Sequence, residues 1–278
     1  MEDVDAAAVK DRSGYRKESM RSFVIGDVHG CAQELGALLG KLDREDAGAR
    51  LVFVGDLFTK GPEPEGVVEE LLARRVEGRE LVLVCGNHEI KLRKHLRRAV
   101  DRPREEHESN HAETVHALRD SGLLHEALEL VEEAMCQVTY AIPGERCTVV
   151  HGGIDPTLGL ALTPDAHKVT VKSEEDERDW WWDYDGRDGL IVVGHKPFRE
   201  PVRVPSPDQR RGRPIVVNVD TGCAYGGMLT AYEPSADRFL TVPSQQALQP
   251  WFMGRRQSSP EMAAPRAASD ARDRKLSG

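Results

Sequence analysis

The chain has 278 residues, of which 39% are hydrophobic, so it can bury the core of one large domain. Its net charge of -9 argues against a general nucleic-acid binder with a basic surface, and no DNA partner is expected. No stretch approaches the roughly 18 apolar residues of a membrane span, and the polar first residues do not form a secretory signal. Five cysteines without a CxxC pair argue against a disulfide framework, so a cytoplasmic protein is expected.

The two ends of the chain differ in composition from the middle. Residues 1–20 are charged and predict a loose leader, whereas residues 254–278 have the Ala/Ser/Pro/Arg bias of a disordered tail. Residues 21–245 are therefore expected to form the folded domain.

The first third of this domain alternates strands and helices. Short apolar runs predict strands at 22–26, 51–55 and 81–85. Leucines at 35, 38, 39 and 42 fall on one helical face, and a second helix is expected over 64–77. Together these elements predict a parallel βαβαβ unit.

The rest of the domain divides into a helical part and a strand-rich part. Residues 88–135 carry helical signals, interrupted by the proline and charges of "DRPREEHESN", and are expected to form a helical cap over one sheet face. Strands are predicted from there on, at 136–142, 147–151, 190–194, 215–219, 228–233 and 238–242. The fold class is thus α/β with added α+β elements.

Five of the apolar runs end in metal-binding residue types. These endings are GDVHG, GDLFTKG, GNHE, HGG and GHKP, and they contribute Asp27, His29, Asp56, Asn87, His88, His151 and His195. Since ligands collect at the carboxyl ends of parallel strands, these side chains are expected to meet. Carboxylate, amide and imidazole together suit first-row divalent ions, manganese before iron, zinc, cobalt or nickel. Seven groups are too many for one tetrahedral ion, so two ions sharing a carboxylate and activating a water are expected.

In their order and separation, the five blocks resemble the signature of the calcineurin-like metallophosphoesterases, phosphoprotein phosphatase branch, over residues 22–242. The resemblance implies a four-layer αββα sandwich with two divalent metal ions. It implies that the first metal is held by Asp27, His29 and Asp56, and the second by Asp56, Asn87, His151 and His195. It further implies that His88 donates a proton to the leaving oxygen and that the positive residue of the second block, Lys60, holds the phosphoryl group.

Two positions depart from the protein phosphatases. Lys60 stands where they carry an arginine, and Thr59 where they carry an aspartate that orients the histidine. These departures, with the block "VDTGCAYGGMLTAYE" at 219–233, resemble the symmetrical bis(5'-nucleosyl)-tetraphosphatases and their ApaH-like relatives. The resemblance implies hydrolysis of nucleotide phosphoanhydrides such as dinucleoside polyphosphates.

Several alternatives stay open. "HGGIDP" is more similar to bacterial Ser/Thr protein phosphatases, so a protein phosphatase or another phosphomonoesterase is the alternative, and a metal-binding scaffold without turnover is a further one. Phosphorylated small molecules or proteins are thus the expected partners, and the oligomeric state is open. Arg187 is a second candidate for binding substrate phosphate. The aromatic run at 180–184 could stack on bases or pack internally, and the basic "LRKHLRR" could steer polyphosphate or be a solvated helix face.

Overall fold

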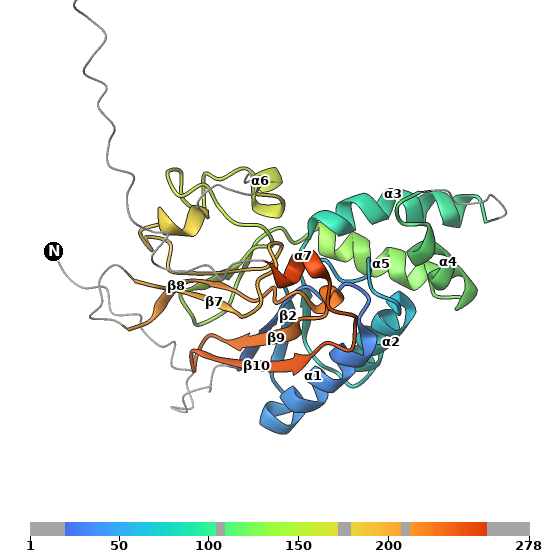
Figure 1. Ribbon diagram of the computed structural model, residues 1–278, viewed down its shortest axis with the longest axis horizontal. Helices are drawn as coiled ribbons and strands as arrows, with labels where there is room; N and C mark the ends of the chain where they lie inside the picture. Colours follow the sequence, from blue (N-terminus) through green and yellow to red (C-terminus); the bar gives the residue numbers. More distant parts are fainter. Residues whose placement is uncertain (1–19, 104–108, 172–178, 207–211, 255–278) are drawn as a thin grey trace, which may run out of the picture.

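The computed structural model describes residues 20–103, 109–171, 179–206 and 212–254 (Figure 1). The predicted leader and tail lie outside these residues, apart from Met20 and Gly254. Two five-stranded sheets form the centre of the molecule. No helix within the described residues is both long enough and apolar enough to cross a membrane.

The first sheet contains the predicted parallel unit. Its strands, in spatial order, are β10 (Arg238–Pro243), β9 (Met228–Glu233), β1 (Ser22–Ile25), β2 (Arg50–Phe53) and β3 (Leu81–Leu83). β1, β2 and β3 are parallel, with Phe23 opposite Leu51 and Leu51 opposite Leu81. β9 and β10 extend the sheet in antiparallel fashion. The predicted strand-helix-strand order is thus confirmed, with strand ends one or two residues shorter than expected.

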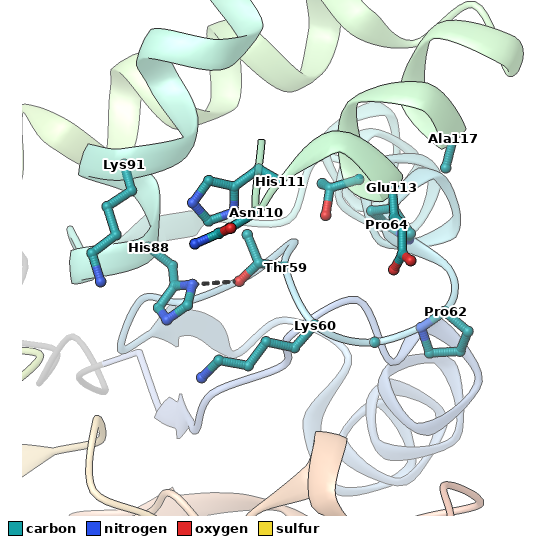
Figure 2. Close-up of a pocket in the computed structure, with 12 residues that line it drawn as sticks. Thr59, Lys60, Pro62, Pro64, His88, Lys91, Asn110, His111, Glu113 and Ala117 are labelled. Carbon is teal, nitrogen blue, oxygen red and sulfur yellow. Dashed lines mark hydrogen bonds between the residues drawn. The ribbon is translucent and has the colours of Figure 1, made fainter. Parts of the chain in front are cut away.

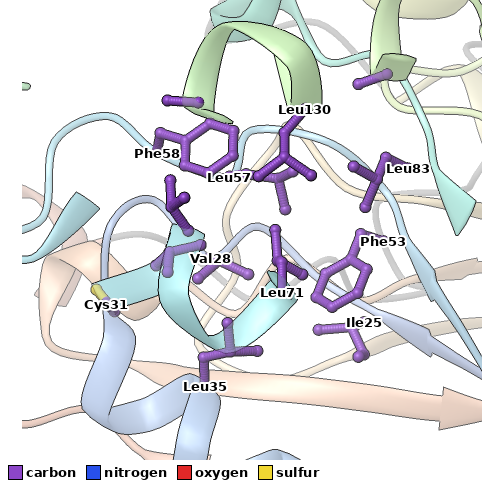
Figure 3. Close-up of a cluster of buried hydrophobic side chains, with 14 of the residues drawn as sticks. Ile25, Val28, Cys31, Leu35, Phe53, Leu57, Phe58, Leu71, Leu83 and Leu130 are labelled. Carbon is purple, nitrogen blue, oxygen red and sulfur yellow. The ribbon is translucent and has the colours of Figure 1, made fainter. Parts of the chain in front are cut away.

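Two helices connect the parallel strands and cover one face of the first sheet. α1 (Ala32–Asp46) buries all four leucines of the predicted face, and α2 (Pro64–Val76) begins with a proline whose fixed backbone suits a first helical turn. Successive residues of β1 point to opposite faces, so Phe23 and Ile25 pack beneath the helices whereas Val24 faces the second sheet. Figure 3 shows Ile25, Phe53 and Leu83 of three strands meeting Leu35 and Leu71 of the two helices.

The second sheet is mixed. Its strands, in spatial order, are β4 (Tyr140–Ala141), β5 (Cys147–Val149), β6 (Leu190–Val193), β8 (Pro214–Asn218) and β7 (Val202–Pro205). The strand predicted over 136–142 was wrong in its first half, because Cys136 and Gln137 complete the last turn of the preceding helix and only β4 pairs. β7 was missed, because its run of four residues contains an arginine and ends in proline.

Three further helices follow β3: α3 (Asn87–Asp101), α4 (Ala112–Asp120) and α5 (Leu124–Met135). The break expected at "DRPREEHESN" separates α3 from α4. Leu96 of α3 and Leu130 of α5 join the core under the first sheet's helices, so the three helices extend that helical layer beyond β3 (Figure 1).

Within the described residues, the outer face of the second sheet carries two short helices, α6 (Asp165–Val169) and the single-turn η1 (Trp180–Trp182), over a core that includes Trp181, Tyr184 and Phe198. A valine-rich core lies between the two sheets. Two short helices, η3 (Cys223–Tyr225) and α7 (Pro250–Met253), flank β9 and β10 in the chain. The αββα sandwich is confirmed, with a thin fourth layer.

Candidate metal centre

The loops that follow β1 and β2 are joined to each other by backbone hydrogen bonds. His29 N donates to Asp56 O over 2.9 Å, Gly30 N to Leu57 O over 2.8 Å, and Gly61 N to His29 O over 2.6 Å. Because backbone groups make these bonds, the loops hold the side chains of Asp27, His29 and Asp56 in fixed positions.

Asp56 lies at the middle of the predicted ligand group. Its Oδ2 is 3.6 Å from His29 Nε2, and its Oδ1 is 3.4 Å from His151 Nε2. The same carboxylate thus faces an imidazole on each side, and it belongs to two potential metal-binding clusters, one with His29 and His88 and one with His151 and His195. One carboxylate shared by two clusters is the arrangement expected for two ions.

Asn87 and Asp27 lie next to the histidines of the two clusters that share Asp56. Asn87 Oδ1 lies 3.2 Å from His151 Nε2 and 3.0 Å from His195 Nδ1. Asp27 Oδ2 lies 3.9 Å from His29 Nε2, and both its oxygens accept the His195 N–H at 3.2 Å. The structure therefore brings together all six residues predicted as metal ligands, and their roles at the metals are proposals taken up below.

The donor atoms of this group fit cations. His151 Nδ1 lies 2.9 Å from the Val54 carbonyl oxygen, which can only accept, so Nδ1 carries a proton and Nε2 is the ring atom turned toward the acceptor oxygens of Asp56 and Asn87. The Nε2 of His29 likewise lies 2.8 Å from a cation, the ammonium of Lys60. Buried oxygen and nitrogen acceptors that face one another in this way require positive charge between them.

The titration behaviour of the same residues agrees with this fit. Burial opposes a charge on His151, but the neighbouring Asp56 carboxylate outweighs it and raises the pKa of His151 to about 10. Burial raises the pKa of Asp27 well above its usual range, and the nearby carboxylate of Asp220 adds to this. Both pKa values are raised because buried acceptor groups lie close together, and bound divalent ions would neutralise the negative charge among them.

The site is built on strained backbone. Among the described residues, five non-glycine residues have positive φ, and four of them belong to this group: His29 (51°), Asp56 (54°), Lys60 (77°) and His195 (70°). The left-handed region costs a residue with a Cβ roughly 1–2 kcal/mol, so the surrounding fold must compensate for the strain. Such strain concentrates at functional sites.

Two glycines allow the ligand-bearing loops to lie close to one another. A Cβ at Gly194 would collide with the carboxylate of Asp27, and one at Gly86 would collide with that of Asp56. The glycine before each of these ligand loops therefore leaves room for a carboxylate that belongs to another loop.

Glu89 was missed from sequence. It is buried in the first turn of α3, and its Oε2 accepts the N–H of Asp56 at 2.7 Å and of Gly86 at 2.9 Å, while Oε1 accepts the N–H of Leu57 at 2.8 Å. Burial, with the charge of Asp56, raises the pKa of Glu89 to about 7. The available signal was its place at the third residue of a helix, where a glutamate commonly reaches back to cap the N-terminus.

Replacing Glu89 with glutamine is expected to destabilise the fold by about 1–3 kcal/mol, because an amide nitrogen cannot accept the backbone N–H groups that one carboxylate oxygen now accepts. Urea unfolding measures the change. Glu69→Gln, at an exposed position of α2, is the matched control and should leave the midpoint unchanged. Equal urea midpoints for the wild type and Glu89→Gln would mean that the hydrogen bonds accepted by Glu89 do not stabilise the fold.

His88, Thr59 and Lys60 lie beside the ligand group. Thr59 Oγ1 is 2.7 Å from His88 Nδ1, so a neutral hydroxyl orients the imidazole. Burial lowers the pKa of His88 to about 4, and Lys60 and Lys91 contribute to the shift, so the imidazole is neutral at pH 7. Lys60 Nζ lies 5.2 Å from the centre of the Tyr225 ring, a contact not foreseen from sequence. Tyr225 therefore flanks the cation that faces His29.

Other sequence candidates lie apart from this group. The guanidinium of Arg187 is exposed and bonds to Asp185 at 2.9 Å and 3.0 Å, and none of its described contacts reaches a predicted metal ligand. The structure therefore does not bring Arg187 to the centre, because the carboxylate two residues away holds it.

The aromatic and basic runs have structural partners. Trp181 is buried, with ring centres 5.9 Å from Phe198 and 5.8 Å from Trp180, so this run packs internally. In the basic run, Arg93 and Arg97 pair with Glu132 on α5. The thiols of Cys31 and Cys223 are buried. The contact with Cys31, together with burial, raises the pKa of Cys223 above its usual range. Neither is a reactive nucleophile.

An αββα sandwich whose loops gather two carboxylates, an amide and three imidazoles defines the class of metal-dependent hydrolases that act on phosphate. More specifically, the chain belongs to the calcineurin-like phosphoesterase family, whose profile matches residues 20–238. Its activity is therefore hydrolysis of phosphoester or phosphoanhydride bonds, and the family assignment made from the sequence blocks is confirmed.

The relatives found by comparison align with most of the chain. A protein of Halalkalibacterium halodurans named bis(5'-nucleosyl)-tetraphosphatase PrpE, asymmetrical, is 31% identical over 82% of this chain and 96% of its own length. The protein of the same name from Oceanobacillus iheyensis is 29% identical over 82% of this chain and 94% of its own. A solved structure described as a candidate diadenosine tetraphosphatase matches with a TM-score of 0.57 and 24% identity, over 82% of this chain and 95% of that one. This last likeness supports the fold.

Proposed function

We propose that this chain hydrolyses nucleotide phosphoanhydrides, dinucleoside polyphosphates in particular, at a centre of two divalent ions. The observation that carries the proposal is the 2.7 Å contact of His88 with the hydroxyl of Thr59. Among the described residues, the carboxylate nearest the imidazole is that of Asp56, 3.9 Å from Nε2, and none contacts Nδ1 to favour the protonated form from that side. The names of the relatives from Halalkalibacterium and Oceanobacillus point to the same substrate class.

The link between Thr59 and the substrate is the leaving group. Hydrolysis of a phosphoserine or phosphothreonine expels an alkoxide, which needs a proton donor at the moment of bond cleavage. Hydrolysis of a phosphoanhydride expels a phosphate, whose second pKa is about 6 and which leaves without a proton at pH 7. A neutral His88 suits the second reaction better than the first.

Each of the two ions is assigned a set of protein ligands. Asp27, His29 and Asp56 would hold the first ion, and Asp56, Asn87, His151 and His195 the second, with manganese the ion that we expect from this mixture of oxygen and nitrogen donors. Bound divalent ions supply an acidified water and neutralise phosphoryl charge. With His29 engaged by an ion, the ammonium of Lys60, which here lies 2.8 Å from His29 Nε2, would be available to hold a phosphoryl oxygen. We expect the reaction to take place in the cytoplasm.

Product analysis tests the proposal. The purified chain is incubated with Mn²⁺ and, in parallel, with diadenosine tetraphosphate, a phosphothreonine peptide and an aryl phosphate, and the products are separated by chromatography. Two ADP molecules indicate symmetrical cleavage, the reaction of the enzymes that the sequence blocks resemble. ATP together with AMP indicates asymmetrical cleavage, the reaction specified in the relatives' name. Release of phosphate from the peptide with intact dinucleotide would overturn the proposal in favour of a protein phosphatase.

A further inference from the structure

A pocket of about 320 Å³ opens beside His88, between the loop of Lys60 and helices α3 and α4 (Figure 2). Thr59 and His88 form its inner end, while Asn110, His111 and Glu113 line the side formed by α4 and the residues before it. The pocket lies at the lower end of the volumes of small-molecule sites, so it suits one end of a nucleotide better than a folded polypeptide.

Positive charge is concentrated at the end of this pocket nearest His88. Lys60 and Lys91 both line the pocket together with His88, so two cationic side chains border this end of it. Lys91 follows His88 by three residues on α3, a spacing that puts the two side chains on the same helical face. Figure 2 shows the nitrogen of Lys91 extending toward the level of the His88 ring.

Lys91 differs from Arg93 and Arg97 of the same helix in its partners. Arg93 and Arg97 pair with Glu132 of α5, whereas no ion pair within the described residues engages Lys91. Its side chain is exposed, and its ammonium is available to a ligand. Glu113 lines the opposite side of the pocket in Figure 2, where its carboxylate repels phosphate and can accept hydrogen bonds from sugar hydroxyls.

We propose that this pocket receives the leaving nucleoside phosphate of the substrate, and that Lys91 selects for a leaving group that is itself a phosphate. This inference rests on the proposed function. Water forms a new P–O bond to one phosphorus and gives up a proton to solvent, while the anhydride P–O bond breaks and the departing phosphate keeps the electron pair on its terminal oxygen. Lys91 stabilises that oxygen and the charge already present on its phosphate. A phosphopeptide or aryl phosphate has no phosphate on the leaving side, so it gains less from Lys91.

The test compares Lys91→Met, Lys91→Arg and, as a matched control, Lys94→Met, an exposed lysine of the same helix that does not line the pocket. We expect Lys91→Met to lower kcat/KM for diadenosine tetraphosphate by about 10- to 100-fold, as for loss of a charged hydrogen bond. The loss on an aryl phosphate should be far smaller, below about threefold, and Lys91→Arg should recover most of the activity. Inhibition of aryl phosphate hydrolysis by ADP should weaken about tenfold in Lys91→Met and remain unchanged in Lys94→Met.

The outcomes separate this inference from the proposed function. If the wild type cleaves the dinucleotide but Lys91→Met loses activity equally on both substrates, or on neither, the role of Lys91 is overturned and the proposed function stands. If the wild type cleaves only the aryl phosphate, the proposed function fails, and the inference fails with it. Equal thermal unfolding of all variants shows that differences in rate do not come from the fold.

Discussion

Replacing Asp56 with asparagine is expected to abolish divalent-metal binding and to lower kcat/KM by at least about 1,000-fold, because several kcal/mol of transition-state stabilisation depend on the ions. Asp56 faces an imidazole on each side, at 3.6 Å from His29 and 3.4 Å from His151. Asparagine keeps the shape of the side chain and can still accept the His88 N–H, which bonds to Oδ1 at 2.9 Å. The loss would therefore come from the missing charge.

Calorimetric titration with Mn²⁺ and aryl phosphate hydrolysis measure the two effects on the same preparation. Asp120→Asn, at an exposed position of α4, is the charge-matched control and should bind metal and turn over like the wild type. If Asp56→Asn keeps turnover while it loses metal, or binds two ions as the wild type does, the shared-carboxylate centre is wrong.

The second large effect is expected from His88→Asn, and its size should depend on the leaving group. General acid catalysis contributes about 100- to 10,000-fold where a proton must reach the leaving oxygen. We expect a loss at the lower end of that range, about 100-fold, for aryl phosphates of weakly acidic phenols, because the lowered pKa of His88 leaves only a small fraction of the imidazole protonated at pH 7. The loss for diadenosine tetraphosphate should stay below about tenfold, since a phosphate leaves unprotonated.

A series of aryl phosphates gives the measurement. The logarithm of kcat/KM is plotted against the pKa of the phenol for the wild type and for His88→Asn. The variant should show the steeper dependence, because the most basic leaving groups lose most when the donor is removed. Parallel lines, with the same loss on the dinucleotide, would mean that His88 acts on the phosphoryl group alone and gives no proton to the leaving group.

The position of the candidate site followed from local sequence patterns. Short branched runs such as "LVFVG" predict buried strands, and parallel strands bring their carboxyl ends to one edge, so Asp27 and Asp56 had to converge if the strands paired. The leucine face of α1 was readable for the same reason, since a helical period appears in the residues themselves.

Contacts between residues far apart in the chain could not be predicted from local sequence patterns. Glu89 accepts the backbone N–H of Asp56, which lies 33 positions earlier in the chain, and Tyr225 of η3 contacts Lys60 from near the end of the domain. Neither residue type reveals its partner without the fold. Arg187 shows the opposite case, because its charge suggested a phosphate contact whereas its neighbour Asp185 holds it at the surface. The pocket of Lys91 depends on how α3 and α4 pack, which periodicity does not determine.

The most direct measurement of the central claim is a competition in one tube. Equal concentrations of diadenosine tetraphosphate and a phosphothreonine peptide are mixed with the chain and Mn²⁺, and the ratio of the two initial rates gives the ratio of their kcat/KM values. We predict that the dinucleotide is consumed first and that removal of metal by a chelator stops the reaction. Faster loss of peptide phosphate, or turnover that persists with the chelator, would contradict a metal-dependent nucleotide phosphoanhydride hydrolase.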